Sequence, residues 1–422
     1  MTVIYEASVR LWLGAGQKDV TMMDMAHSKH EKFKGQHWGL TSMDGDRRII
    51  TIAWGLCTIE NEQTYTTFLK DLQRFKLDGV SVIKEAMDRS DHVNFSDRFK
   101  GIPAAQKSVF PSMRAKNCLK HMIPNIAKAP GVSNFNPHAQ GFFWKAGTAV
   151  TKHAFLAAME ELKKVCPGAV TYLNKIGDEK WALYPDATTQ ALYGHKCSNL
   201  IESRNSTYVP ARGMAPLRVL DNITEVVMKD ISDKRAAATK RYNGGDGHLL
   251  TKWAADQYEQ QRSLSSHYTV TGSSEHVFFV DVGSGGRHRV DLQQNTCACS
   301  FWKQWGLPCR HAIAAANSDG RMGDFNEFIT WAFDPMYLMV NYTKALKDTI
   351  CEVIDLATLT PDGITKPNLN VKQAGRPRTR RIRSSGATAA DGGTTRRGRV
   401  QTCNSCGTTG HNERTCTEKQ WG

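Results

Sequence analysis

Four residues in the last third of the chain have the types and spacing of a metal site. The segment CACSFWKQWGLPCRH contains a Cys-x-Cys pair, nine intervening residues and a Cys-x-His pair. The potential ligands are Cys297, Cys299, Cys309 and His311. Thiolates and an imidazole are ligands that Zn²⁺ binds tetrahedrally, and a site with four protein ligands is closed, hence structural. We therefore predict a structural zinc ion at these four side chains.

A second pattern of this kind lies near the C-terminal end of the sequence. CNSCGTTGHNERTC has the spacing C-x2-C-x4-H-x4-C. Its potential ligands are Cys403, Cys406, His411 and Cys416. This is the zinc-knuckle pattern, and a segment with so few hydrophobic residues folds only when metal is bound. We therefore expect a second structural Zn²⁺ at these four residues. Knuckles often bind single-stranded nucleic acid, especially RNA, so such a partner is also expected.

Three acidic residues, Asp24, Asp97 and Glu202, are candidates for catalysis. Converging carboxylates repel one another and are stable mainly when divalent cations neutralise them, so these acids would hold two Mg²⁺ or Mn²⁺ ions. Two such ions can activate an attacking oxygen and stabilise the leaving oxygen of a phosphodiester. Singly, each acid is better explained as a turn former or helix cap, and only their order favours catalysis. Glu160 and Glu161 are alternatives for the third acid, but they fit the solvent face of a regular amphipathic helix.

The elements that must position these acids predict an α/β core. The expected strands cover residues 18–24, 37–43, 48–57, 92–97 and part of 113–121, and the expected helices cover 63–75, 102–109, 154–165, 198–205 and 217–240. Asp24 and Asp97 would then end the first and fourth strands, and Glu202 would lie in the first turn of a helix. In a sheet of ribonuclease-H-like topology those two strands are neighbours. The two aspartates would therefore meet although 73 positions separate them (97 minus 24).

The same patterns divide the chain into four regions. We expect a ribonuclease-H-like core over 1–265 with a helical insertion at about 119–198, a zinc-finger region over 266–345, a basic disordered linker over 346–402 and the knuckle over 403–416. In the zinc-finger region, strands at 277–282 and 288–292 precede the metal pattern, and an alanine-rich helix at 311–317 follows it.

Several segments resemble the catalytic core of Mutator-like element (MULE) transposases. These are MDMAHSKHEKFKG, IITIAWGLCTIENEQTYTTFLKDL and FSDRFKGIPAAQKSVFPSMRAKNCLKHM, with SNLIESRNS and LDNIT resembling the later part of that core. The first zinc pattern, with Pro308 before its second pair, resembles the SWIM zinc finger that these transposases carry after the core. The resemblance covers roughly residues 15 to 345. It implies that Asp24, Asp97 and Glu202 are the three catalytic acids in that order.

The resemblance also gives a place to Cys118 and His121. In MULE transposases a Cys-x-x-His pair follows the second acid, and CLKH occupies that position here. We treat the pair as a family marker near the active site. Taken alone, two residues cannot make a closed zinc site, and a buried thiol beside a structural histidine would show the same sequence.

Positive charge is concentrated in the tail. The formal net charge is +14, and residues 366–422 hold +9 of it (12 Lys or Arg minus 3 Asp or Glu). A tail with this positive charge is expected to bind a polyanion such as nucleic acid. Within it, GRPRTRRIR resembles an AT-hook, whose arginines lie in the narrow A·T minor groove. The nucleic-acid-binding candidates are Arg376, Arg378, Arg380 and Arg381. A nuclear-localisation signal or a general phosphate-binding segment would use the same residues.

Together these features predict a DDE-type transposase that acts in the nucleus on DNA, at the ends of its element and at the target. The alternative is a domesticated or truncated copy that binds DNA or a protein through its zinc modules and does not cut. We find no counterpart of the family's amino-terminal DNA-binding region before the first expected strand. No run approaches the roughly 18 apolar residues of a membrane helix, so no membrane partner is expected. The sequence leaves open whether the chain forms a homo-oligomer.

Overall fold

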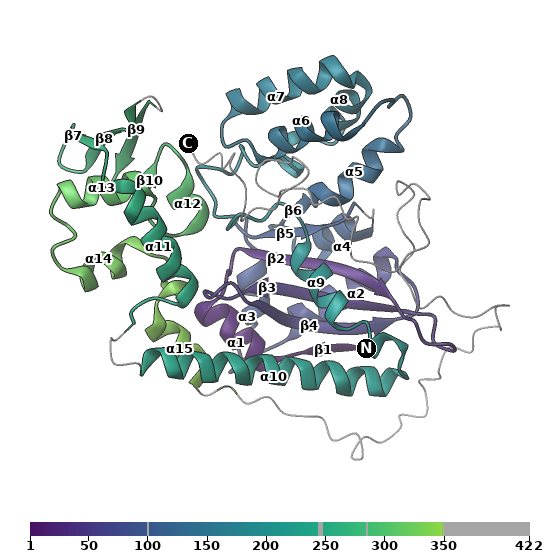
Figure 1. Ribbon diagram of the computed structural model, residues 1–422. Helices are drawn as coiled ribbons and strands as arrows, with labels where there is room; N and C mark the ends of the chain where they lie inside the picture. The colour runs from purple at the N-terminus through teal and green to yellow at the C-terminus, as the bar shows by residue number, and fades with distance from the viewer. Residues whose placement is uncertain (99–100, 244–247, 284–285, 348, 350–422) are drawn as a thin grey trace, which may run out of the picture.

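A mixed six-stranded sheet lies at the centre of the molecule (Figure 1). The computed structural model describes residues 1–98, 101–243, 248–283, 286–347 and 349. The strands are β1 (Thr2–Ile4), β2 (Val20–His27), β3 (Gln36–Met43), β4 (Ile49–Cys57), β5 (Val93–Ser96) and β6 (Arg114–Asn117), in the spatial order β1-β4-β3-β2-β5-β6. The pairs β1–β4, β4–β3 and β3–β2 are antiparallel, whereas β5 runs parallel to both β2 and β6. The fold is therefore mixed α/β, as expected.

One face of the sheet is covered by helices from both ends of the described chain. They are α1 (Glu6–Ala15), α2 (Glu62–Arg74), α3 (Val82–Met87), α4 (Gly101–Val109) and α15 (Met339–Lys347), and all contribute to one hydrophobic cluster. Met23 and Met25 of β2 point into that cluster. Helix α2 starts at Asn61, whose side-chain oxygen accepts a hydrogen bond from the backbone N–H of Thr64 at 2.8 Å. Such a cap satisfies a donor that the first turn leaves unpaired.

The opposite face packs against α9 (Asn199–Thr207). Met22 of β2 and Phe95 of β5 share a second hydrophobic cluster with Leu200 and Ile201 of this helix. Because side chains alternate along a strand, residues two positions beyond Met22 and Phe95 also face this side of the sheet. The long helix α10 (Pro216–Tyr242) follows and runs along the β1 side of the molecule (Figure 1).

Four helices form a module of their own beyond β6 (Figure 1). They are α5 (Leu119–Ala127), α6 (Pro137–Thr148), α7 (Lys152–Val165) and α8 (Pro167–Asn174), and they share a separate hydrophobic cluster. Trp181 stacks on Phe143 within it, with ring centroids 5.4 Å apart. A buried ion pair of 2.8 Å joins Lys116 of β6 to Asp186, which follows the module. The helices expected between 119 and 198 are thus present.

A small antiparallel sheet carries the metal pattern. Its strands β7 (Thr269–Gly272), β8 (Val277–Asp281), β9 (Arg287–Asp291) and β10 (Thr296–Cys297) lie in the order β10-β9-β8-β7. The helices around it are α11 (Lys252–Ser265), α12 (Phe301–Trp305), α13 (Arg310–Ser318) and α14 (Phe325–Ala332). Strands β8 and β9 and helix α13 confirm the elements predicted there.

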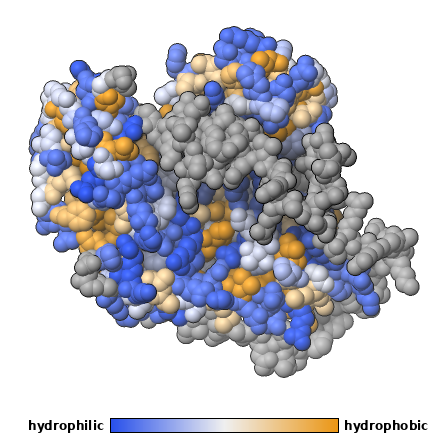
Figure 2. Space-filling view, in the orientation of Figure 1, coloured by the Kyte–Doolittle hydropathy of each residue, from blue (hydrophilic) through white to orange (hydrophobic). Residues whose placement is uncertain are grey.

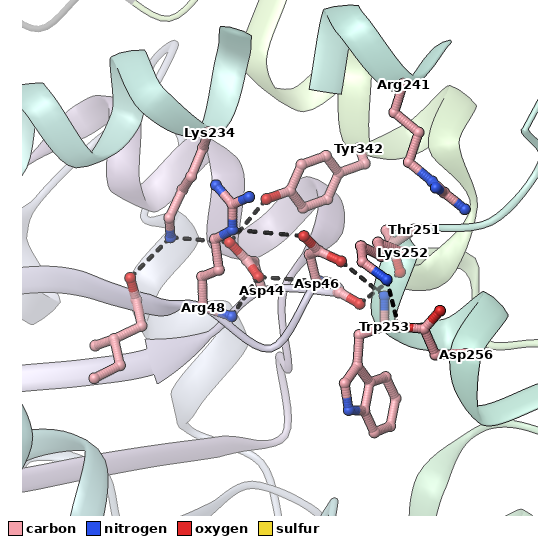
Figure 3. A network of polar contacts seen from close by, with 12 residues as sticks. Asp44, Asp46, Arg48, Lys234, Arg241, Thr251, Lys252, Trp253, Asp256 and Tyr342 are labelled. Carbon is pink, nitrogen blue, oxygen red and sulfur yellow. Dashed lines mark hydrogen bonds and ion pairs between the residues drawn. The ribbon is translucent and has the colours of Figure 1, made fainter. Parts of the chain in front are cut away.

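A buried polar network ties the turn after β3 to three later helices (Figure 3). Asp44 forms an ion pair of 2.9 Å with Lys234 of α10. Tyr342 of α15 donates its hydroxyl to the same carboxylate oxygen at 2.9 Å. Asp46 accepts a hydrogen bond of 2.9 Å from the backbone N–H of Trp253, in the first turn of α11. The central sheet is therefore connected directly to the helices before and after the small sheet.

The structure differs from the sequence prediction in several places. Strand β1 and helix α1 precede the first predicted strand and were not expected. Strand β2 continues to His27, so Asp24 lies within it and not at its end. Strand β6 ends at Asn117 and α5 begins at Leu119, so Cys118 and His121 lie at the start of a helix. A strand of three residues such as β1 carries too little periodicity to be recognised.

No helix within the described residues is both long and apolar enough to cross a membrane. On the face shown in Figure 2, hydrophilic residues predominate and hydrophobic ones form small separate groups.

Candidate active site and metal sites

Asp24 lies in β2, and Asp97 directly follows β5, the parallel neighbour of β2. Met22 of β2 pairs with Phe95 of β5, an offset of 73 positions (95 minus 22). Asp24 and Asp97 have the same offset (97 minus 24), but the paired register ends at Met22 and Phe95, and Asp97 directly follows the last residue of β5. Asp24 shares the face of Met22, which α9 covers, and Asp97 is close enough for its charge to repel that of Asp24. The expected adjacency of these two strands is confirmed.

The surroundings of Asp24 disfavour an isolated negative charge. Burial, and after it the repulsion from Asp97, raises the pKa of the Asp24 carboxyl to about 7, while the charge of His121 opposes that rise. Asn205 of α9 donates its side-chain amide to Asp24 Oδ2 at 3.5 Å. A buried carboxylate beside a second one is an arrangement that divalent cations neutralise.

Glu60, on the connection after β4, is a further acid that the sequence analysis missed. Burial raises the pKa of Glu60, and Asp97 also raises it. Tyr65 donates its hydroxyl to Glu60 Oε1 at 3.0 Å. No spacing marks Glu60 in the sequence. Asn205 was also missed, but it follows Glu202 by three positions in α9, and that helical spacing could have shown that the two share a face.

Glu202 is placed differently from the two aspartates. One carboxylate oxygen, Oε2, accepts from Lys120 Nζ at 2.6 Å, and the other, Oε1, lies 3.5 Å from His121 Nε2. Within the described part of the chain, metal-competent side chains meet in groups of three or more at two places, and neither contains Asp24 or Asp97. The structure therefore brings Asp24 and Asp97 together and places Glu202 beside His121. The pKa of His121 is raised mainly by its interaction with Cys118 and to a smaller extent by the charges of Glu202 and Asp24.

The first of the two groups contains the four residues of the C-x-C and C-x-H pairs. Cys297, Cys299, Cys309 and His311 place one ligand atom each within 4.8 Å of all the others. Cys297 ends β10, Cys299 lies in the turn after it, Cys309 is the N-cap of α13, and His311 lies in the first turn of that helix. The second group contains Cys118, His121 and Glu202, again with ligand atoms within 4.8 Å of one another.

Two family models match the chain over these regions. Residues 20–125 match the MULE transposase domain, from the first residue of β2 into α5. Residues 278–320 match the SWIM zinc finger, which spans the first group of metal-competent side chains. The chain therefore contains a MULE transposase domain followed by a SWIM zinc finger. A search of curated proteins finds no match to it.

The MULE transposase domain contains both aspartates and the Cys118–His121 pair, whereas Glu202 follows the matched residues. A transposase domain indicates that the protein binds DNA. In the matched segment, the parallel pairing of β2 with β5 brings the strand that contains Asp24 beside the strand that Asp97 follows.

The side chains of the SWIM zinc finger fit a zinc ion. The Nδ1 atom of His311 lies 3.6 Å from Cys297 Sγ and 3.9 Å from Cys309 Sγ. Tetrahedral zinc, with bonds of about 2.0 to 2.3 Å, separates its ligand atoms by about 3.5 Å. The backbone N–H of Ala312 donates to Cys309 Sγ at 3.4 Å, which helps to stabilise a thiolate there. The pKa of the Cys299 thiol is lowered well below its usual value, mainly by interaction with the thiol of Cys297 and next by that of Cys309.

A ring that the sequence analysis did not single out supports His311. His288 of β9 stacks on it, with centroids 4.0 Å apart and planes at 14°. Its position one strand before the metal pattern gave no indication of this contact.

The remaining predicted site residues lie outside the described residues. These are the arginines Arg376, Arg378, Arg380 and Arg381 and the knuckle residues Cys403, Cys406, His411 and Cys416.

Proposed function

We propose that this protein is a DDE-type transposase that cleaves and joins DNA strands with Mg²⁺ or Mn²⁺ held by Asp24, Asp97 and Glu202. The observation that carries the proposal is the proximity of Asp24, in β2, to Asp97, directly after the neighbouring β5, inside the MULE transposase domain. The order β4-β3-β2-β5-β6, antiparallel on one side of β2 and parallel on the other, supports a ribonuclease-H-like core. In such a core, the acids of its first and fourth strands form the catalytic centre.

Bound at these acids, two divalent ions would activate the attacking oxygen and stabilise the leaving oxygen of a phosphodiester. The role of the protein is to hold the two aspartates in position. Asp24 lies in β2 and Asp97 directly follows β5, and nearby side chains of these strands, such as Met22 and Phe95, are buried and hold the two strands in place. The amide of Asn205 orients one oxygen of Asp24. Water would attack at the ends of the element, and the freed 3′-hydroxyl would then attack target DNA.

Glu202 joins the site from α9 in this proposal. Its Oε2 atom is paired with Lys120, which is nearly half exposed and free to move toward solvent. Exchange of this ion pair for a divalent ion would bring a third carboxylate to the centre. The contact of Asn205 with Asp24, one turn farther along α9, supports this placement because it already brings the helix to the acids.

The zinc modules complete the proposal. The SWIM ligands Cys297, Cys299, Cys309 and His311 would hold a structural zinc ion. In the tail, the arginines from Arg376 to Arg381 would bind DNA, and the knuckle would hold a second zinc ion and bind single-stranded nucleic acid. We propose that the protein acts on this DNA in the nucleus.

A cleavage assay tests the proposal. The purified chain is incubated with DNA carrying the ends of its element, with Mg²⁺, Mn²⁺ or EDTA, and is compared with Asp97→Asn and with Glu85→Gln, an exposed acid on α3. We expect metal-dependent cleavage by the unchanged chain and by Glu85→Gln, and none by Asp97→Asn. DNA binding without cleavage by the unchanged chain would contradict the proposal and favour a domesticated, DNA-binding protein. Cleavage retained in Glu202→Gln would remove Glu202 from the catalytic set.

A further inference from the structure

The second group of metal-competent side chains combines three kinds of ligand atom from two helices. Cys118 is the N-cap of α5 and is fully buried. His121 lies one turn farther along α5, and Glu202 comes from α9. One thiol, one imidazole nitrogen and one carboxylate oxygen all lie within 4.8 Å of one another. The sequence shows Cys118 and His121 only as an isolated pair, and the structure adds Glu202 as a third member.

An unpaired atom points to a missing partner in this group. The Oε1 atom of Glu202 is buried and accepts no hydrogen bond, although it lies 3.5 Å from His121 Nε2. A buried carboxylate oxygen without a partner is costly, and a cation is the usual remedy. The other oxygen, Oε2, is paired with Lys120 at 2.6 Å. This division resembles that of a metal-ligating carboxylate, in which one oxygen binds the metal and the other is held by the protein.

A fourth potential ligand lies next to the group. The thiol of Cys197, which is buried just before α9, lies beside the thiol of Cys118 but is not one of the three grouped side chains. Because this residue precedes Glu202 by only five positions, the same short segment would supply two ligands, as α5 supplies the other two.

We propose that Cys118, His121 and Glu202, with Cys197 beside them, form a zinc site distinct from the SWIM zinc finger. Sulfur and nitrogen ligands select zinc over Mg²⁺ and Ca²⁺, which prefer oxygen. A thiolate, a carboxylate and a neutral imidazole would balance the two charges of the ion. Should Cys197 also bind as a thiolate, the ammonium of Lys120 would compensate the extra negative charge.

The ion would join α5 to α9 beside the acids of the sheet. His121 already acts electrostatically on both Asp24 and Glu202, so the zinc would lie next to the proposed catalytic centre. A carboxylate can bridge two metals, and ligation of zinc through Oε1 leaves Oε2 of Glu202 for an ion on the aspartates. The zinc site does not depend on strand cleavage. A protein without any nuclease activity could contain it.

The experiment counts zinc in the full-length chain by inductively coupled plasma mass spectrometry after removal of loosely bound metal. The background is Cys403→Ser, which removes one predicted knuckle ligand and leaves the described core unchanged. We expect about two zinc ions per chain in this background, one for the SWIM zinc finger and one for the new site. Adding Cys118→Ser or His121→Asn should reduce the count to about one. The matched control is Cys166→Ser, because Cys166 is equally buried but bonds to the backbone oxygen of Ser133.

A count of about one in the Cys403→Ser chain would overturn the proposal, whether or not the other variants fold. An unchanged count of about two after Cys118→Ser and His121→Asn, with both proteins folded by circular dichroism, would do so as well. Because neither DNA nor Mg²⁺ is present, failure of this inference is distinguishable from failure of the proposed transposase activity.

Discussion

Lys234 of α10 and Asp44 of the turn after β3 form an ion pair of 2.9 Å in which both side chains are buried (Figure 3). Lys234 also donates to the backbone oxygen of Ile49 at 2.8 Å, and Tyr342 donates to Asp44. The same helix carries a second pair with the same separation, Lys229 with Asp233 at 2.9 Å, but that pair is exposed. Because the two ion pairs differ chiefly in burial, comparing them shows how much burial changes the contribution of an ion pair to stability.

Lys234→Met should reduce the free energy of unfolding by about 3 to 5 kcal/mol, because it leaves the carboxylate of Asp44 buried without its cation. Lys229→Met should leave stability almost unchanged, because exposed pairs are screened by water and salt. Urea unfolding followed by tryptophan fluorescence measures both. Equal losses in the two variants would show that burial of the Lys234 pair does not determine its contribution.

His92 should make the protein sensitive to acid. It lies in the core, with Nδ1 2.8 Å from the backbone oxygen of Lys18 and Nε2 3.0 Å from Thr21 Oγ1. Burial lowers the pKa of His92 from 6.5 to about 4. Below about pH 6.5 the unfolded chain binds a proton at this residue and the folded chain does not. Stability is therefore lost as the pH falls from about 6.5 toward 4, by up to about 3 kcal/mol from this group.

The variant His92→Asn removes this titration. Its unfolding midpoint should fall less steeply between pH 7 and pH 4.5 than that of the unchanged chain, whatever its absolute stability. His138→Asn, a change at an exposed histidine of α6, should leave the steepness unaltered. Parallel pH profiles for His92→Asn and the unchanged chain would be incompatible with a buried neutral imidazole at this position.

The relation between Asp24 and Asp97 could be predicted from sequence because it depends on strand order and on the alternation of side chains. Helix α2 was equally predictable, because its buried residues recur at helical spacing. The approach of Glu202 to His121 could not be predicted, because it depends on how α9 and α5 pack against each other across 81 positions (202 minus 121). Nothing local in the sequence encodes that distance.

Buried charges were also beyond sequence reasoning. Lys116 and Lys234 belong to segments whose patterns suggest exposed lysines, yet both are buried. Each is stabilised by a buried aspartate far away in the chain, Asp186 and Asp44 respectively. A single sequence shows the charges but not the pairing that makes their burial tolerable.

Removal of zinc from the SWIM zinc finger should unfold that module and leave the central sheet intact. Helix α13 packs against α11 and the small sheet, and two of the four proposed ligands lie at its start. In Cys309→Ser, hydrogen exchange should accelerate across residues 277–318, because structural zinc supplies much of the folding energy of such modules. Peptides from β2, β3 and β4 should keep their protection. Unchanged exchange over 277–318 would argue against a structural metal there, and Cys166→Ser provides the comparison.

Gly39 lies where α9 packs closely against the sheet. Gly39 of β3 pairs with Asp24, and a Cβ atom at this position would lie 2.6 Å from the Cδ1 methyl of Ile201. Gly39→Ala should therefore cost about 1 to 3 kcal/mol through overpacking. It should also displace α9, and with it Asn205 and Glu202, from the aspartates.

Ile201→Val removes the methyl group that clashes, and alone it should cost about 1 kcal/mol. In the double variant the two changes should compensate, so that the summed single losses exceed the measured loss by more than about 1 kcal/mol. Mn²⁺ affinity, measured by calorimetry, should fall in Gly39→Ala and recover in the double variant. Additive losses, with no recovery of affinity, would show that contact between Ile201 and Gly39 does not set the distance of α9 from the acids.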